Sequence, residues 1–337
     1  MRDAGWPIDP ADRFVLARLE AGGLHPVRQA SPLEWLRRAS FDLTGLPPTP
    51  EQVAAFTPSD GTGVPESRYT RQVDDWLASP AFGQRWARHW LDVARFAESA
   101  GKERNHLFPE AWRYRDWVVD AFNADMPFDF FLLRQIAGDL LPPSGDAATD
   151  AASTIATGFL MVGPKALAET DKEQSRLDIV DDQIDVTGRA MLGLTLACAR
   201  CHDHKFDAVR ATDYYAMAGI FRSTEPFQNE VRNATMWWEF PIPQEAGVEP
   251  IMVMAPKETQ PRNLRVHLRG NRFTLGKVVP RGPLWIVAAT ATESDRKPII
   301  DPHQMSSGRL ELARWIASPS NPWTARVLVK RVWQLHF

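Results

Sequence analysis

The residues of this chain best suited to chemistry are its two cysteines and the histidine that follows the second of them. Cys198, Cys201 and His202 form a C-x-x-C-H motif, and the sequence contains no further cysteine. At this spacing two thiols can add to the two vinyl groups of a haem, and the next histidine can ligate the iron through a neutral imidazole. The motif therefore predicts one covalent haem c with His202 as its proximal ligand.

Three other uses of the same residues remain open. A thioredoxin-like redox dithiol also needs C-x-x-C, but normally with the first cysteine at a helix N-terminus, whereas Cys198 follows a predicted helix. A zinc site needs about four ligands, which Cys198, Cys201, His202 and His204 could supply only from one short run. The third alternative is a disulfide or an inert thiol pair.

Polar residues directly after the motif are candidates for orienting the haem. Asp203, His204 and Asp207 follow His202 closely enough to hydrogen-bond it or a haem propionate. We therefore expect these three residues to belong to the cofactor-binding site.

The sixth iron position is predicted from ligand chemistry. His89 lies in a predicted helix flanked by tryptophans and is the leading ligand candidate. Packing of this histidine into a helix interface is the interpretation that we favour. Met191, Met217 and Met161 are weaker candidates, because methionine packs in cores by default. An open position would instead permit peroxide or gas chemistry.

Four aspartates recur at i, i+3, i+4 and i+7 and so share one face of a predicted helix: Asp178, Asp181, Asp182 and Asp185. Such a cluster could bind a cation or hold an acid of raised pKa. We prefer a simpler interpretation, in which these are solvated carboxylates in the first turns of a helix, where the helix dipole favours them.

Most of the chain has helical signals. Helix starts are predicted at Asp9, Ser31, Thr49 and Ser79, each followed by proline. Further helices fit 109–123, 127–141 and 176–199, and the Pro-, Gly- and Ser-rich stretch 142–154 reads as a mobile loop. Short strands are predicted at 251–254, 264–268 and 284–287. The spacing of Trp86 and Trp90, and of Trp112 and Trp117, favours core packing over sugar binding.

Long stretches of sequence are similar to a known family. They are the motif extended to 198–207, together with 10–16, 40–50, 85–92, 137–142 and 185–190. On these stretches the chain resembles the planctomycete cytochrome-c-type domain of unknown function (PSCyt-type), found in secreted proteins. Residues 307–310, 321–327 and 333–337 resemble the start of the planctomycete PSD-type domain, also of unknown function, that usually follows it. The chain ends within a predicted helix without a capping Gly or Asn, which indicates a fragment.

These signals together predict a mainly α, multi-helix globular fold that carries the C-x-x-C-H motif. They also predict a small β-rich segment near 245–292 and a C-terminal helical fragment. The expected domains are a cytochrome-c-type helical domain at 7–225, a β-rich connecting segment at 226–300 and the truncated start of the following domain at 301–337.

Composition and charge bear on the partners of the protein and on the compartment in which it works. The net charge of −3 and the pI near 6.3 give no basic footprint for nucleic acid. No stretch approaches the ~20 apolar residues of a membrane span, and residues 1–6 have no apolar signal region. Haem c is attached outside the cytoplasm, and the family resemblance implies an export signal upstream. We therefore expect a periplasmic or secreted protein.

Three functions follow as expectations. The first is an exported c-type haem protein that transfers electrons to an unknown redox partner. The second is a haem peroxidase-like enzyme with an open iron position. The third is a non-haem exported scaffold, or a module associated with carbohydrate such as polysaccharide, in which Cys198 and Cys201 form a disulfide.

Overall fold

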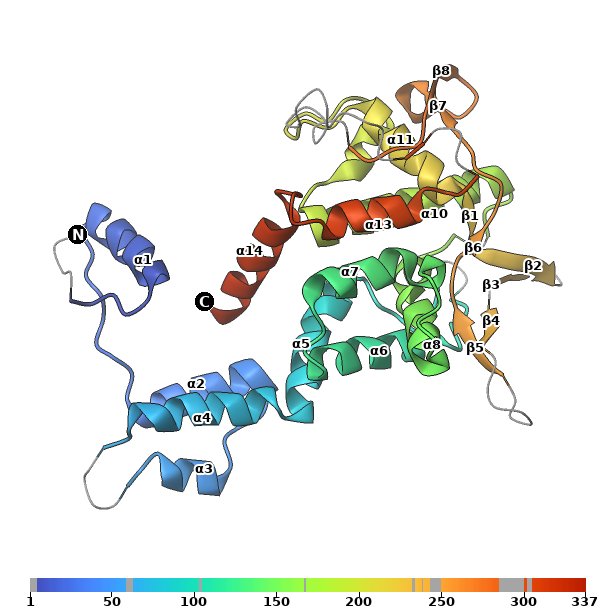
Figure 1. The fold of residues 1–337 in the computed structure, drawn as a ribbon. Coiled ribbons are helices and arrows are strands. Elements are labelled where there is room, and N and C mark those ends of the chain that lie inside the picture. The colour runs from blue at the N-terminus through green and yellow to red at the C-terminus, as the bar shows by residue number, and fades with distance from the viewer. Residues whose placement is uncertain are drawn as a thin grey trace. The chain divides into compact units, whose positions relative to one another are not determined.

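The computed structural model describes residues 5–58, 63–102, 105–166, 168–231, 234–237, 239–242, 250–284, 300–301 and 305–337. Figure 1 shows its ribbon. The fold is mainly helical, with small antiparallel strand pairs and a C-terminal helix, which confirms the predicted class. The chain divides into two compact units, Met1–Trp76 and Leu77–Phe337.

The first unit contains α1 (Pro10–Ala21), α2 (Pro32–Thr44), α3 (Pro50–Ala55) and most of α4 (Glu66–Leu77). The predicted start signals at Asp9, Ser31 and Thr49 are confirmed. Each of these side chains accepts a hydrogen bond from the helix backbone, and each is followed by proline in the first turn. Leu36 and Phe56 form the buried centre of this unit together with Trp76.

The helices of the second unit pack around one hydrophobic core. They are α5 (Pro80–Val93), α6 (Ala111–Asn123), α7 (Phe128–Ala137), α8 (Ala147–Ala156), α9 (Gly158–Met161), α10 (Lys172–Thr187), α11 (Ala211–Arg222), α13 (Arg309–Ala317) and α14 (Thr324–His336). Four short turns of other helix types accompany them: η1 (Gly138–Leu140), η2 (Gly188–Leu192), η3 (Leu196–Arg200) and η4 (Leu268–Gly270). Helix α5 packs on α6, α10 on α11, and α13 along α7 (Figure 1).

The described strands form antiparallel pairs. They are β1 (Thr224–Glu225) with β6 (Lys257–Glu258), β2 (Phe227–Val231) with β3 (Ala234–Trp237), β4 (Glu239–Ile242) with β5 (Ile251–Met254), and β7 (Leu264–His267) with β8 (Leu275–Val279). The strands predicted at 251–254 and 264–268 are confirmed. The strand predicted at 284–287 lies, beyond Leu284, outside the described residues.

The prediction of a mobile loop at 142–154 is wrong, because α8 occupies most of it. The Asp146 carboxylate accepts from the backbone N–H of Thr149 at 2.9 Å and so caps the helix. The residues after it are rich in alanine, the best helix former. Only the stretch before Asp146 is left as loop.

The tryptophan prediction holds for three of its four residues. Trp86, Trp90 and Trp117 are buried, whereas Trp112 is 39 % exposed, with the Arg113 guanidinium 4.3 Å from its ring centre. A five-residue step turns a helix by about 140°, so Trp112 and Trp117 cannot share one face of α6. Within the described part of the chain, no helix is long and apolar enough to cross a membrane.

A buried arginine joins α13 to the rest of the second unit. Arg309 has no exposed surface. Its guanidinium bonds both carboxylate oxygens of Asp139 at 2.7 Å, Glu258 at 2.9 Å and the Ile136 carbonyl at 3.0 Å. Two carboxylates and a carbonyl thus satisfy most of the guanidinium donors, as a buried charge requires.

Candidate functional site

The C-x-x-C-H motif lies on a turn between α10 and α11. The left-handed backbone of Gly193, at φ +66°, ends the helical run of α10 and η2, and η3 then carries the first cysteine. Ala199 is buried, whereas Cys198 and Cys201 are both exposed and neither forms a disulfide. The turn therefore presents two accessible thiols three positions apart in sequence, the spacing at which they can attach to the two vinyl groups of a haem.

The His202 side chain is exposed, and a single backbone carbonyl orients its ring. Its Nδ1 lies 2.7 Å from the carbonyl oxygen of Asp203. Because a carbonyl oxygen only accepts, Nδ1 carries the proton and donates it, and the lone pair of the neutral ring is on Nε2. Proteins commonly orient a metal-ligating histidine in this way.

Both ring nitrogens of His204 are engaged within the loop. Its Nδ1 accepts from the backbone N–H groups of Phe206 at 3.1 Å and Asp207 at 2.7 Å. The proton of the neutral ring is therefore on Nε2, which lies 3.0 Å from Oγ1 of Thr195 and 3.6 Å from the Asp207 carboxylate. His204 thus closes the loop that follows the motif, and its neutral form has no nitrogen lone pair left for a metal.

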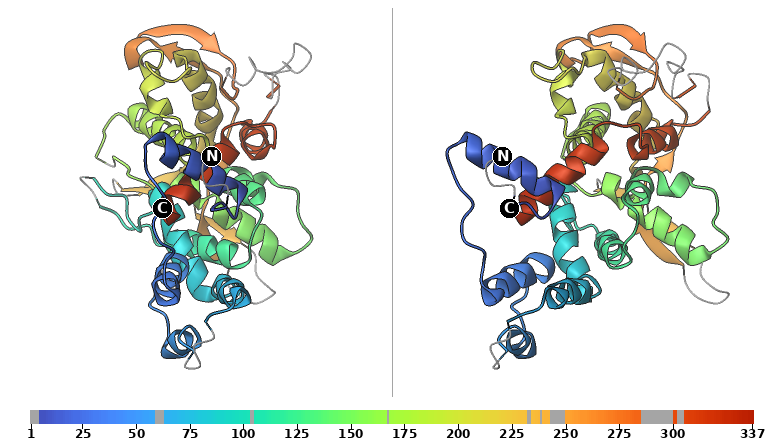
Figure 2. Two further views of the ribbon diagram at one scale, coloured as in Figure 1. Left: turned by 90° about the vertical axis from the view of Figure 1, so that its left-hand side faces the viewer. Right: turned by 60° about the vertical axis from the view of Figure 1, so that its left-hand side comes forward.

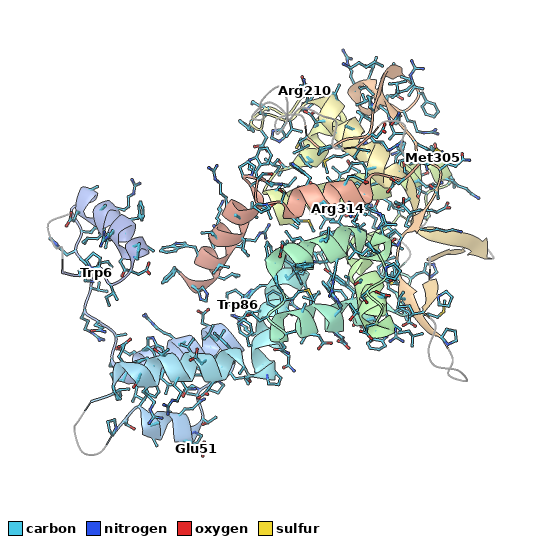
Figure 3. The ribbon with its side chains drawn as sticks, viewed as in Figure 1. Trp6, Glu51, Trp86, Arg210, Met305 and Arg314 are labelled. Atoms are coloured by element: carbon cyan, nitrogen blue, oxygen red, sulfur yellow. The ribbon has the colours of Figure 1, made fainter. Side chains whose placement is uncertain are left out.

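Asp203 fastens the same loop to α11. Its carboxylate accepts from the backbone N–H of Ala211 at 2.8 Å, while its carbonyl accepts from His202. Figure 3 labels Arg210, which marks the end of this loop. The residues predicted to orient the haem therefore fix the course of the loop backbone, and Asp203 also contacts His202 directly.

Arg200, inside the motif, pairs with the acidic face of α10. Its Nη1 lies 3.0 Å from the carboxylate of Asp178 and 3.5 Å from that of Asp181. The Tyr214 hydroxyl donates to Asp181 at 2.6 Å. Burial raises the pKa of Asp181, although Tyr214 and Arg200 oppose that rise. These contacts hold the turn of the motif against α10 and α11.

The other two predicted aspartates also face arginines. Asp182 accepts two hydrogen bonds from Arg95, at 2.8 and 2.5 Å, and Asp185 pairs with Arg189 at 2.7 Å. Helix α10 begins at Lys172, so the series starts only in its second turn. The interpretation as first-turn carboxylates favoured by the helix dipole is therefore wrong, since that effect fades beyond the first turn. Pairing with arginines explains the cluster.

A hairpin from a distant part of the chain lies against the motif. Gly270, in the turn between β7 and β8, has φ +73°, and a Cβ placed on it would lie 2.5 Å from Sγ of Cys201. The hydroxyl of Tyr215 lies within hydrogen-bond distance of two carbonyl oxygens, that of Arg200 at 2.9 Å and that of His267 at 3.3 Å. Figure 2 shows the hairpin beside α11. Helix α11 thus joins the hairpin to the motif.

Sequence reasoning missed His267 at this site. Its side chain is buried, and its ring lies 5.1 Å from that of Tyr215. Burial lowers the pKa of His267. A single histidine in a short strand carries no local signal that it will lie near a motif far back in the sequence.

The predicted sixth ligand, His89, lines a cavity of about 330 Å³ that α5, η2 and α14 border. Its ring lies 5.5 Å from that of Trp86, which in turn packs 5.0 Å from that of His336 on α14 (Figure 3). Met191 borders the same cavity. None of the described residues that line this cavity belongs to the loop of the C-x-x-C-H motif. Iron ligation by His89 stays a prediction.

The remaining metal candidates are packed in the core or not gathered. Met161 and Met217 are fully buried among apolar side chains, the default use of methionine. Among the described residues, no three His, Cys, Asp or Glu side chains are grouped so as to hold a metal ion. A zinc site made from the motif therefore has no assembled ligand set in this part of the chain, whereas a haem needs only one protein ligand and two thioether bonds.

A polar cavity of about 300 Å³ lies behind the motif and is lined in part by Ala197, Asp178, Asp181 and Lys165. Lys165 is 1 % exposed, and burial lowers its pKa to about 8. The neighbouring carboxylate of Asp182 partly opposes that fall in pKa.

Two family models match this chain. The model of PSCyt2, described as a protein of unknown function (DUF1549), matches residues 10–226. The model of PSD1, also described as a protein of unknown function (DUF1553), matches residues 308–337. The predicted resemblances and their order are thereby confirmed. No curated protein and no solved structure matches the chain. The motif lies inside the first match, and the β7–β8 hairpin lies between the two.

Proposed function

We propose that this chain, which belongs to the PSCyt2 family of proteins of unknown function, is an exported c-type haem protein that transfers electrons. One haem is bound covalently through Cys198 and Cys201, with His202 as proximal ligand. The observation that carries the proposal is the exposed pair of free thiols on one turn, followed by a histidine whose Nε2 lone pair is left for iron.

The residues fit the group chemically. Both thiols are accessible, and the residue between them that points inward is a small alanine, Ala199. A thioether at each cysteine leaves the hydrogen bonds of the loop intact, because the described bonds of the loop use backbone groups and the side chains of Asp203, His204 and Asp207. Attachment therefore needs no rearrangement of those bonds.

When bound, the haem supplies an iron that can exchange one electron. The chain contributes orientation. The Asp203 carbonyl fixes the tautomer of His202 and strengthens Nε2 as a ligand. Tyr215 and Arg200 hold the turn that carries both thiols, and His204 holds the loop that follows.

Covalent attachment also implies the compartment. Haem c is joined to its protein outside the cytoplasmic membrane, so the proposal of a covalent haem requires export to the periplasm or beyond. Two exposed thiols in that oxidising environment would otherwise be expected to form a disulfide. Haem attachment gives both cysteines another covalent partner.

The test is to express the chain behind an export signal together with a cytochrome c maturation system. Wild type should retain haem on a denaturing gel and show sharp α and β absorption bands after reduction. The double variant Cys198→Ser/Cys201→Ser should retain none, and His202→Ala should lose the sharp bands. His25→Ala, at an exposed histidine in the other unit, is the matched control and should resemble wild type.

The same preparation separates the alternatives. Colourless protein, from cells in which a known cytochrome matures normally, contradicts the proposal and leaves the disulfide-linked scaffold. Covalent haem that binds carbon monoxide readily when reduced, and peroxide when oxidised, indicates an open iron position and the peroxidase-like alternative.

A further inference from the structure

We infer that the turn of the β7–β8 hairpin, residues 268–273, forms one wall of the haem site. Leu268 and Phe273 pack against the porphyrin ring, and Arg269 and Arg272 place positive charge beside it. This inference rests on the proposed function, and it adds to the site a segment outside the residues matched by the PSCyt2 model.

The turn lies close to the point at which the haem would be attached. The backbone of Gly270 lies so close to Sγ of Cys201 that a Cβ there would be 2.5 Å from the sulfur. A ring bonded through that sulfur begins within a few ångströms of this turn. The exposed side chains that flank Gly270 therefore lie close to the point of attachment.

The turn also exposes apolar surface. Leu268 is 48 % and Phe273 77 % exposed, although the strands leading to them bury Val279 and His267 against the core. Apolar side chains grouped at one place on a surface commonly mark a contact site. The flat apolar face of a porphyrin is an occupant of matching chemistry, and its point of attachment lies next to them.

The turn is also positively charged. It carries two guanidinium groups, and a haem carries two ionised carboxylates, so cations beside the ring offset its negative charge. Arg272 is held in place by its ion pair with Asp171, the capping residue of α10, and its guanidinium lies 4.0 Å from the centre of the Phe273 ring. Arg269 is exposed beside it. Two apolar and two cationic side chains thus lie within six residues.

Hydrogen bonds order the turn and connect it to the C-x-x-C-H motif. Within it, backbone N–H groups bond the carbonyls of Leu268, Asn271 and Thr274 at 2.9 to 3.1 Å. At its base, the Tyr215 hydroxyl lies between the carbonyl oxygens of His267 and Arg200. A turn held by these contacts needs no rearrangement when haem is attached.

The experiment compares trypsin cleavage of the full chain with and without attached haem. Cleavage after Arg269 and Arg272 is mapped by mass spectrometry, with cleavage after Arg326, exposed on α14 in the same unit, as the reference. We expect haem to slow cleavage at both hairpin arginines at least tenfold relative to Arg326. Equal cleavage in the two forms overturns the inference while leaving covalent haem in place.

Two variants of the loaded protein give a second readout. Phe273→Ser should lower the haem reduction potential, because water then reaches the ring, and Arg269→Gln should lower it by removing a positive charge. Val329→Ser, at an exposed apolar residue of α14, is the matched control and should leave the potential unchanged. Hairpin variants that behave like Val329→Ser contradict the inference. Absence of covalent haem from wild type contradicts the proposed function itself, and this inference with it.

Discussion

Replacement of Gly270 by alanine tests the contact between the hairpin and the motif without any haem. The new Cβ meets two separate obstacles. The backbone is left-handed at φ +73°, which costs a non-glycine residue about 1–2 kcal/mol. The Cβ also lies 2.5 Å from Sγ of Cys201, and such overpacking costs about 1–3 kcal/mol. We expect Gly270→Ala to lower the free energy of unfolding by about 2–5 kcal/mol.

A matched control separates the two obstacles. Gly101 lies in the same unit with φ +60°, and nothing lies within 4 Å of a Cβ placed there. Gly101→Ala should therefore show only the backbone cost, about 1–2 kcal/mol. Urea unfolding of the haem-free protein, followed by tryptophan fluorescence, gives both values.

A double-mutant cycle then identifies the sulfur as the obstacle. In Cys201→Ala the Sγ is gone, so Gly270→Ala made in that background should cost no more than Gly101→Ala. Its coupling with Cys201→Ala should be about 1–3 kcal/mol. If Gly270→Ala and Gly101→Ala cost the same in wild type and no coupling with Cys201→Ala is found, the hairpin does not lie against the motif and the reasoning is refuted.

Two further predictions concern buried charges. Arg309→Ala leaves Asp139 and Glu258 without their buried partner and should destabilise the protein by about 3–5 kcal/mol. Arg314→Ala, at an exposed residue of the same helix, should change stability by less than about 0.5 kcal/mol. Equal effects of the two variants in urea unfolding would contradict the structural role of Arg309. Burial lowers the pKa of Lys165 from 10.5 to about 8. Below pH 8 the buried charge therefore lowers the free energy of unfolding, and this destabilisation disappears as the pH rises towards 10.5. Lys165→Met should accordingly stabilise the protein by about 3 kcal/mol at pH 7 and progressively less between pH 8 and 10.5, and a gain independent of pH would show that Lys165 is not the cause.

The parts of this fold that the sequence predicted are those fixed by neighbouring residues. Ser31 and Thr49 start helices because each side chain reaches a backbone N–H three residues on. The Asp203 carbonyl can orient the His202 ring because the two residues are adjacent. The error at 142–154 was of the same local kind, since the alanines after Asp146 favoured a helix over the loop that Pro and Gly suggested.

The parts that could not be predicted depend on residues far apart in the chain. Gly270 against Cys201 is such a pair, and nothing in the hairpin sequence indicates which loop it will lie on. Arg309 reaching Asp139 is another. A single sequence gives helical or strand periodicity, but it does not say which faces meet, so the acidic face of α10 was recognised while its arginine partners were not.

Covalent haem would be seen most directly in the intact mass of the denatured protein after export and maturation. We expect a mass increase equal to one haem, absent from the Cys198→Ser/Cys201→Ser variant, with the modified peptide containing both cysteines. A wild-type chain with unmodified cysteines, or with Cys198 and Cys201 joined in a disulfide, would contradict the proposal.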